Sequence, residues 1–296
     1  MVNKIYFNEK LHKYTDENQN VYTSVTTIIG KYEHPFDIED FSRRCAFKKG
    51  SPYENMNPTQ VKMEWKRINK EACDKGTKKH NYLENIIKTS TGYKLDDGYI
   101  NDRIYTIDEI LLDNSFGELS LDKYSTWKLE EKYPKIDNII KVLYNEGYKL
   151  YSEVCVYDSN RLISGLIDIL CIRGEEFLIL DWKTNKHKIM DKSGYFKKDR
   201  QGKSTGEFVE TNKFFKYPLV GLQESKKNIY NMQLSLYAYL VKQRGLKLNG
   251  LILAHMRGEE GEEEITDILK MTYLEDYVEK MIGHFCAMQP KNLFTL

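Results

Sequence analysis

The chain has 296 residues and a mass of 35.0 kDa, and 41% of its residues are hydrophobic, enough for one large domain or a domain with an appendage. A mean hydropathy of −0.61 and the absence of any apolar run of about 18 residues exclude a membrane-spanning helix. Its 45 basic and 44 acidic residues give a net charge of +1, so nucleic-acid binding would have to depend on local clusters of charge.

Signals for export, disulfide bonds and ATP use are missing from the sequence. The residues after Met1 do not form a basic, apolar and small-residue signal peptide, which predicts a cytoplasmic protein. The five cysteines are scattered without a C-x-x-C pair, so we expect neither disulfides nor a zinc knuckle. No G-x-x-x-x-G-K-[ST] loop occurs, so we expect no ATP hydrolysis.

The beginning of the chain predicts a β-hairpin that leads into a helix. The segments 5–7 and 12–14, with the polar segment 16–20 between them and residues 21–22, are typical of short strands and turns. Ser24 follows and stands where a helix cap is expected. A cap and an exposed ligand contact are equally compatible with this position.

Helices are predicted next. A short helix is expected at residues 38–48. A second is expected to start at Asn57, which is followed by a proline in the first turn and a glutamine at the third position, as is typical of helix starts. Gly76 is expected to interrupt this second helix or to separate it from a third. His80 and Glu84 are four residues apart and share a helix face. A lone histidine on a helix is usually structural.

Residues 89–133 are assigned no chemistry, although 107–112 favour a helix and 96–98 favour a turn. Pro134 then begins an amphipathic helix that stops at Gly147. We therefore divide the chain into an N-terminal hairpin and helical region, residues 1–133, and a core region, residues 134–296, which together are expected to form one compact unit.

The central part of the chain predicts three short strands joined by two hairpins, because apolar runs alternate with turn-forming clusters. Each strand carries an acidic residue: Glu153, Asp168 and Asp181. Lys183 follows two residues after the last of them. Because side chains alternate along a strand, Asp181 and Lys183 are expected on one face of the sheet and Trp182 on the other.

Three carboxylates among apolar strand residues need positive charge nearby, and one lysine cannot neutralise all of them. A divalent metal would, and oxygen ligands suit Mg²⁺ or Mn²⁺. Such a site favours phosphodiester hydrolysis, in which Lys183 orients the attacking water or neutralises charge on the phosphate. The alternative is an ordinary ion pair at the end of a surface strand.

A basic segment follows the last of these strands. Residues 181–203 contain eight basic and three acidic residues, so phosphate contacts are expected there. The candidate DNA-binding residues are Lys186, Lys188, Lys197, Lys198 and Arg200, together with Ser24 upstream. Residues 185–217 lack a clear hydrophobic period and predict a mobile loop that grips DNA, with aromatic residues at 214, 215 and 217 for stacking or packing. The alternative is a solvated loop with ordinary lysines.

The remainder of the chain predicts a helix at about residues 223–243, a buried strand at 250–255 and a closing helix at 274–286. Gln233 and Tyr237 lie beside the apolar stripe of the first helix. Their amide and hydroxyl groups can bind a phosphate or a metal ligand by hydrogen bonds.

Taken together, these segments resemble the PD-(D/E)XK nuclease superfamily, in particular its RecB-like exonuclease branch, to which phage and mitochondrial genome maintenance exonucleases belong. The resemblance covers about residues 76–240, and Ile167 stands where a proline can precede the aspartate. The matching segments are GTKKHNYLE at 76–84, Glu153, GLID at 165–168, DWKT at 181–184 and QLSLY at 233–237, with the Ser-Val-Thr segment at 24–26 similar to the branch's N-terminal lead-in.

The resemblance implies a restriction-endonuclease-like α/β fold. Its mixed β-sheet core is expected to be flanked by helices, with the N-terminal hairpin and helical region packed over the active-site side. The expected core strands are 149–157, 161–172, 176–183 and 248–255.

The resemblance also implies a metal-dependent DNA exonuclease acting on single-stranded or frayed ends in replication, recombination or repair, with other proteins of those processes as possible partners. His80, Asp168 and Asp181 would bind Mg²⁺ or Mn²⁺, Glu153 a second metal or a bridging water, and no iron–sulfur cluster is expected. Gln233 and Tyr237 would lie beside the site. Open alternatives are a structure- or sequence-selective endonuclease of the defence or restriction type, an inactive DNA-binding module, and a structural protein.

Overall fold

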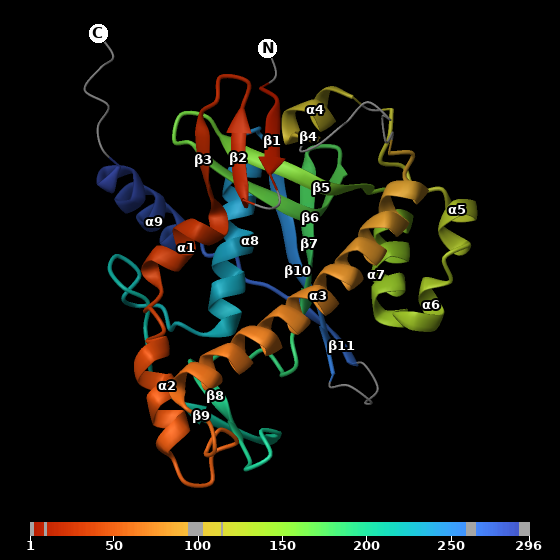
Figure 1. Cartoon of the computed structure of the whole chain (residues 1–296). Coiled ribbons are helices and arrows are strands. Elements are labelled where there is room, and N and C mark those ends of the chain that lie inside the picture. Colours follow the sequence, from red (N-terminus) through yellow and green to blue (C-terminus); the bar gives the residue numbers. More distant parts are fainter. Residues whose placement is uncertain (1–2, 9–10, 94–102, 114, 259–264, 290–296) are drawn as a thin grey trace. The chain divides into compact units, whose positions relative to one another are not determined.

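The computed structural model describes residues 3–8, 11–93, 103–113, 115–258 and 265–289 (Figure 1). The chain forms two compact units that are interleaved along the sequence. The first comprises residues 1–31, 82–188 and 229–296, and the second comprises residues 32–81 and 189–228. The division of the sequence into residues 1–133 and 134–296 stays a prediction. The turn predicted at 96–98 lies outside the described residues.

The first unit contains, within its described residues, a nine-stranded sheet in the order β11-β10-β7-β6-β3-β2-β1-β4, with β5 also paired to β6. The strands are β1 (Ile5–Asn8), β2 (Lys13–Asp16), β3 (Val21–Ser24), β4 (Arg103–Ile104), β5 (Lys149–Asp158), β6 (Ile163–Arg173), β7 (Glu176–Thr184), β10 (Lys247–Arg257) and β11 (Ile265–Lys270).

The centre of the sheet is built from the four core strands that the sequence predicts. β5, β6 and β7 are antiparallel neighbours joined by tight turns, and their near-continuous Ile, Leu and Val content suits strands that are buried on both faces. β10 pairs with β7 in parallel, because α8 (Lys226–Lys242) lies between them in the chain and allows a crossover. The predicted α/β class, with a mixed sheet flanked by helices and an N-terminal hairpin, is confirmed.

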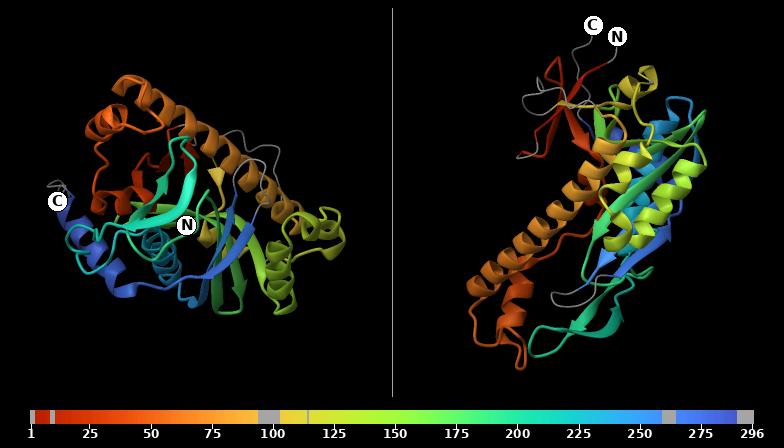
Figure 2. Two further views of the ribbon diagram at one scale, coloured as in Figure 1. Left: turned by 90° about the horizontal axis from the view of Figure 1, so that it is seen from below. Right: turned by 90° about the vertical axis from the view of Figure 1, so that its right-hand side faces the viewer.

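The helices of the first unit cover this sheet. Figure 2 shows α7 (Pro134–Asn145) and the end of α3 (Pro58–Ser90) on the same face, where Ile87 and Ile140 share a core with the buried Trp182 of β7. Burial of such large apolar groups is the main force that holds helix and sheet together. The other helices that contribute to this unit are α1 (Val25–Tyr32), α4 (Ile107–Leu112), α5 (Leu121–Ser125), α6 (Leu129–Lys132) and α9 (Glu275–Met288).

The second unit contains α2 (Ile38–Phe47), the first part of α3 and a hairpin of β8 (Gly194–Lys198) and β9 (Ser204–Glu210). The predicted start of α3 is confirmed: Gln60 N donates to Asn57 Oδ1 at 2.9 Å, and Asn57 N donates to Gln60 Oε1 at 2.8 Å. Such reciprocal bonds satisfy backbone donors that the first turn leaves unpaired.

Two sequence expectations are wrong. Gly76 does not interrupt the helix, because α3 is continuous from Pro58 to Ser90, and a single glycine costs only about 1 kcal/mol against the many helix-forming residues around it. Residues 185–217 are not a structureless loop. Phe196 and Phe208 face each other across β8 and β9 with ring centroids 5.1 Å apart, and such cross-strand aromatic pairs stabilise a hairpin.

No helix formed by the described residues is long and apolar enough to span a membrane.

Candidate active site

The strand register places the three acidic residues in one row across the middle of the sheet. In the antiparallel β5–β6 pair the residue pairs on both sides are in register, so Glu153 stands opposite Asp168. In the β6–β7 pair Ile169 faces Leu180, and the next position outward sets Asp168 opposite Asp181. Residues directly opposite in neighbouring strands lie close enough for their side chains to interact. Three separate stretches of sequence therefore converge at one level of the sheet.

The backbone is unusual at the first member of this row. Glu153 has a φ of +55°, in the left-handed region that residues with a side chain seldom adopt, although it lies within β5. Such a conformation costs about 1–2 kcal/mol for a residue other than glycine. Strained residues of this kind persist where surrounding structure holds them, and they are concentrated at functional sites.

The ladder between β6 and β7 stops at the same level. Its last pair is Ile169 with Leu180, and beyond it the Trp182 backbone N–H donates to Asp168 Oδ2 at 2.8 Å. A side-chain carboxylate thus replaces a backbone carbonyl as the acceptor. The regular pairing of the two strands thus ends where their acidic residues begin.

Lys183 lies next to Asp181 on the face away from the tryptophan. Its Nζ is 2.5 Å from Asp181 Oδ2 and 5.5 Å from the centre of the Tyr230 ring on α8. Trp182 is 1% exposed and packs in the opposite core, so the predicted alternation of these three residues is confirmed. Asp181 is also 1% exposed and the Lys183 side chain is 18% exposed, so the ion pair has one buried and one partly buried member.

The pKa values in this row follow from burial and from the number of carboxylates. Burial, then the charges of Asp168 and Glu84, raise the pKa of Glu153 well above its ordinary value. Burial also raises the pKa of Asp168, against the opposing effects of Lys183 and of the Trp182 N–H. Burial by itself lowers the pKa of Lys183, but the charges of Asp181 and Asp168 outweigh it and raise this pKa, so the lysine is charged at neutral pH.

Two charged residues of α3 belong to this environment and were not predicted as site residues. Glu84 and Lys88 form an ion pair one helical turn apart, and both act electrostatically on Glu153. Glu84 adds a fourth carboxylate to the surroundings of the row. Its place in the GTKKHNYLE segment marks it in the sequence, whereas Lys88 lies outside every motif and only the packing of α3 reveals it.

Gln233 and Tyr237 lie on the neighbouring helix α8, as expected. Gln233 Nε2 donates to Tyr237 Oη at 3.0 Å, and burial followed by the charge of Asp181 raises the pKa of the Tyr237 hydroxyl. The helix can approach because β6 has a glycine at position 165. A Cβ atom there would come within 2.4 Å of Tyr237 Cε1, so any larger residue would push α8 away from the sheet.

The donor chemistry of the row fits a hard divalent cation. Carboxylate oxygens are the ligands that Mg²⁺ and Mn²⁺ prefer. Burial, followed by neighbouring carboxylates, raises the pKa values of Glu153 and Asp168, and a bound cation would favour their charged forms. In the described part of the chain, no three His, Cys, Asp or Glu side chains already form a group that could hold a metal ion. The residues therefore suit such a cation in kind, but their side chains are not arranged around one.

The remaining predicted site residues are divided between the two units. His80 lies on α3 in the second unit, one helical turn before Glu84 in the chain, so its predicted ligation stays a prediction. Lys186 and Lys188 follow β7 in the first unit and are exposed. The second unit contains the exposed cations Lys197, Lys198 and Arg200. Lys197 is ion-paired with Glu207. Phosphate contacts by these residues stay predictions.

Ser24 caps a helix. Its Oγ accepts a hydrogen bond from Thr27 N at 3.1 Å at the start of α1, and the residue is 6% exposed. This is one of the two roles that its position allowed. A contact between Ser24 and DNA stays a prediction.

Comparisons with known proteins show distant structural likeness alone. No family model matches the chain, and no curated protein matches it. A crystal structure of a "putative exonuclease" from Eubacterium rectale is similar at 14% sequence identity, covering 90% of this chain and 78% of the other, with a TM-score of 0.32. At that identity and TM-score the likeness identifies neither a substrate nor a reaction.

Proposed function

We propose that this protein is a divalent-metal-dependent nuclease that hydrolyses phosphodiester bonds of DNA. The observation that supports it is the row of Glu153, Asp168 and Asp181 on three adjacent strands, with the partly buried Lys183 ion-paired to its last member. Three acidic side chains placed side by side in a sheet lower its stability, because each loses contact with water. Their presence therefore favours a functional role. A surface ion pair, the simplest alternative, does not account for an aspartate that is 1% exposed.

Each residue of the row has a role that follows from its surroundings. Glu153, Asp168 and Asp181 would hold Mg²⁺ or Mn²⁺, and the family resemblance adds His80 as a nitrogen ligand. The bound cation supplies Lewis-acid polarisation of the phosphate and makes a water easier to deprotonate. The ammonium of Lys183, held by Asp181, orients the attacking water and stabilises the negative charge that develops on the phosphate.

Gln233 and Tyr237 act beside the acidic row in this scheme, since the charges of Asp181 and Asp168 reach the tyrosine hydroxyl. Their mutual hydrogen bond fixes both side chains on α8, and the tyrosine hydroxyl stays protonated because burial raises its pKa. A protonated hydroxyl can donate to a phosphate oxygen. Both residues are therefore assigned to substrate positioning rather than to proton transfer.

Digestion from single-stranded or frayed ends is the preferred mode, and it is proposed from the family resemblance alone. An endonuclease of the defence or restriction type would use the same row. A catalytically inactive DNA-binding module would retain the fold without turnover. Action in replication, recombination or repair, with partner proteins of those processes, belongs to the same proposal.

The decisive experiment is digestion of single-stranded and duplex DNA labelled separately at each end, in Mg²⁺, Mn²⁺ or EDTA. We expect metal-dependent hydrolysis by the parent protein and none by Lys183→Ala or Asp168→Asn. The product ladder separates terminal digestion from internal cutting. Matched controls are Lys247→Ala and Asp267→Asn, which remove exposed or half-buried members of the pairs Lys247–Glu175 and Arg257–Asp267 in the same unit.

Loss of activity in the site variants with full activity in the controls would support the proposal. Equal activity in Lys183→Ala and the parent would refute the assigned site. Binding of DNA by the parent without cleavage in any metal would favour the inactive binding module.

A further inference from the structure

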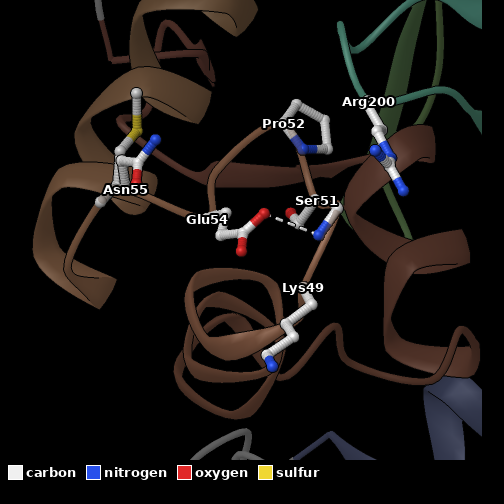
Figure 3. A pocket seen from close by; sticks show the side chains of 8 residues that line it. Lys49, Ser51, Pro52, Glu54, Asn55 and Arg200 are labelled. Carbon is white, nitrogen blue, oxygen red and sulfur yellow. Dashed lines mark hydrogen bonds between the residues drawn. The ribbon is translucent and has the colours of Figure 1, made fainter.

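The second unit contains a pocket of about 580 Å³ that is separate from the acidic row. It is formed by the segment between α2 and α3 and by the β8–β9 turn, which contributes Arg200 (Figure 3). Its lining residues are Lys49, Gly50, Ser51, Pro52, Glu54, Asn55, Met56 and Arg200. The volume is in the range of pockets that hold a small ligand or a single nucleotide.

The pocket has an excess of positive charge. Lys49 and Arg200 are exposed, and in the described parts of the chain neither has a carboxylate within ion-pair distance. The one acidic lining residue, Glu54, accepts a hydrogen bond from Gly50 N at 2.7 Å. The pocket therefore has two cationic side chains and one carboxylate, which already accepts a backbone hydrogen bond, and this balance favours binding of an anion. The Ser51 hydroxyl and the Asn55 amide can donate hydrogen bonds to such an anion.

Gly50 holds Arg200 at the edge of the pocket. A Cβ atom at position 50 would lie 3.2 Å from Arg200 Nε, and Gly50 has a φ of +74°, which glycine adopts without strain. The absence of a side chain thus lets the guanidinium lie directly against the backbone of the α2–α3 segment.

A row of aromatic rings begins at the pocket lining. Tyr53 lies between two lining residues, and its ring centroid is 5.9 Å from that of Trp65 on α3. Trp65 is 6.0 Å from Phe36, and Phe36 is 4.7 Å from Phe41. The Arg44 guanidinium lies 5.8 Å from the centre of the Phe41 ring. We call Phe36, Phe41, Tyr53 and Trp65 the aromatic row.

The end of the aromatic row farthest from Tyr53 is open to solvent. Phe36 is 61% exposed and Phe41 is 44% exposed, so packing within the unit does not account for their position. Exposed aromatic faces beside cations are the features with which proteins bind single-stranded nucleic acid: bases stack on the rings and phosphates contact the cations. Bases in a duplex are already stacked on one another and cannot use such a surface.

From this juxtaposition we infer that the second unit binds single-stranded nucleic acid, with a backbone phosphate in the Lys49–Arg200 pocket and bases on the aromatic row. The inference rests on the proposed function only for the choice of nucleic acid as the ligand. It makes the substrate of the first unit a single strand. A protein partner on the same aromatic residues is the competing outcome of the test.

The test is binding of a labelled oligothymidine in EDTA, measured by fluorescence anisotropy, beside a matched duplex and an abasic oligomer that keeps the phosphates but lacks bases. Phe36→Ala is expected to weaken binding of oligothymidine roughly 5- to 150-fold and to leave binding of the abasic oligomer unchanged. The double variant Lys49→Ala/Arg200→Ala is expected to weaken binding of both and to reduce the slope of log affinity against log salt by about 0.7 for one lost phosphate.

Three further variants serve as controls. Arg67→Ala removes a guanidinium of the second unit that is already ion-paired with Glu64 and Glu71. Leu112→Ala removes an apolar side chain of the first unit that is 75% exposed. Both are expected to bind as the parent does. Phe36→Trp keeps a stacking surface and is expected to retain binding, which separates stacking from loss of folding.

Parent-like binding of oligothymidine by Phe36→Ala and by the double variant would overturn the inference, whether or not the surface binds a protein. Equal loss of both oligomers in Phe36→Ala would also overturn it, because stacking requires bases. Cleavage is scored separately in Mg²⁺ or Mn²⁺. Binding that behaves as expected with no Lys183-dependent cleavage refutes only the proposed nuclease, whereas Lys183-dependent cleavage with parent-like binding in the pocket variants refutes only this inference.

Discussion

Glu153 is expected to lower the stability of the metal-free protein, and its replacement should raise that stability. Two contributions are separable. The carboxyl group is buried beside Asp168 and Glu84, which raises its pKa, and its backbone has a left-handed φ of +55°. Glu153→Gln removes the acidic group and keeps the backbone strain. Glu153→Gly removes both.

The difference between these two variants can be worked out from the backbone. Left-handed φ costs a residue with a side chain about 1–2 kcal/mol. Glycine avoids this cost but loses about 0.5–1 kcal/mol because its unfolded chain is more flexible. Glu153→Gly should therefore exceed Glu153→Gln in free energy of unfolding by about 0.5–1 kcal/mol, while both lose nuclease activity under the proposed mechanism.

Urea denaturation at neutral pH in EDTA, followed by circular dichroism and by tryptophan fluorescence, measures these differences when the two probes give coincident transitions. We expect the parent to have the lowest free energy of unfolding, Glu153→Gln a higher one and Glu153→Gly the highest. If Glu153→Gln has a lower free energy of unfolding than the parent, the acidic group does not destabilise the metal-free protein and the prediction is refuted. Equal stability of the two variants would refute the strain argument.

Three further outcomes are expected for the first unit. Gly165→Ala should destabilise the protein by roughly 1–3 kcal/mol in urea denaturation, since the new Cβ would lie 2.4 Å from a ring carbon of Tyr237, whereas Gly250→Ala, with its nearest neighbour at 3.4 Å, should have a smaller effect. Burial lowers the pKa of His255 to about 4 from 6.5, so the unfolded chain binds the proton first, and stability should be complete above pH 6.5 and fall by about 3 kcal/mol by pH 4. His255→Leu should remove that part of the pH dependence, and an unchanged acid profile would contradict it. Trp182→Ala should cost roughly 3–5 kcal/mol by thermal or urea unfolding, and a smaller loss would mean that the sheet and α7 can close around the gap.

Local patterns in the sequence were sufficient to predict the four core strands and the start of α3. Apolar runs between turn residues identified β5, β6, β7 and β10, and the Asn57 cap identified the start of α3. These signals are short-range, because strand alternation and helix capping depend on residues within a few positions of one another. The same alternation correctly placed Trp182 opposite Asp181 and Lys183.

Two features of the fold were predicted wrongly from the sequence: the continuity of α3 at Gly76 and the β8–β9 hairpin. Gly76 has a low helix propensity, but about 1 kcal/mol is small against the favourable turns on both sides of it in a 33-residue helix. The β8–β9 hairpin has short, mostly exposed strands, so its sequence shows little hydrophobic period. Its cross-strand aromatic pair becomes visible only when the two strands are paired.

The sequence by itself determined that three strands carry one acidic residue each and that a lysine follows the last. Only the tertiary structure decided that Glu153, Asp168 and Asp181 form one row, because strand register depends on hairpin geometry and on which face is buried. The same holds for Glu84 and Lys88, which reach that row through the packing of α3. Residue types and local spacing are properties of the chain, whereas the electrostatic environment of a carboxylate depends on neighbours that are distant in sequence.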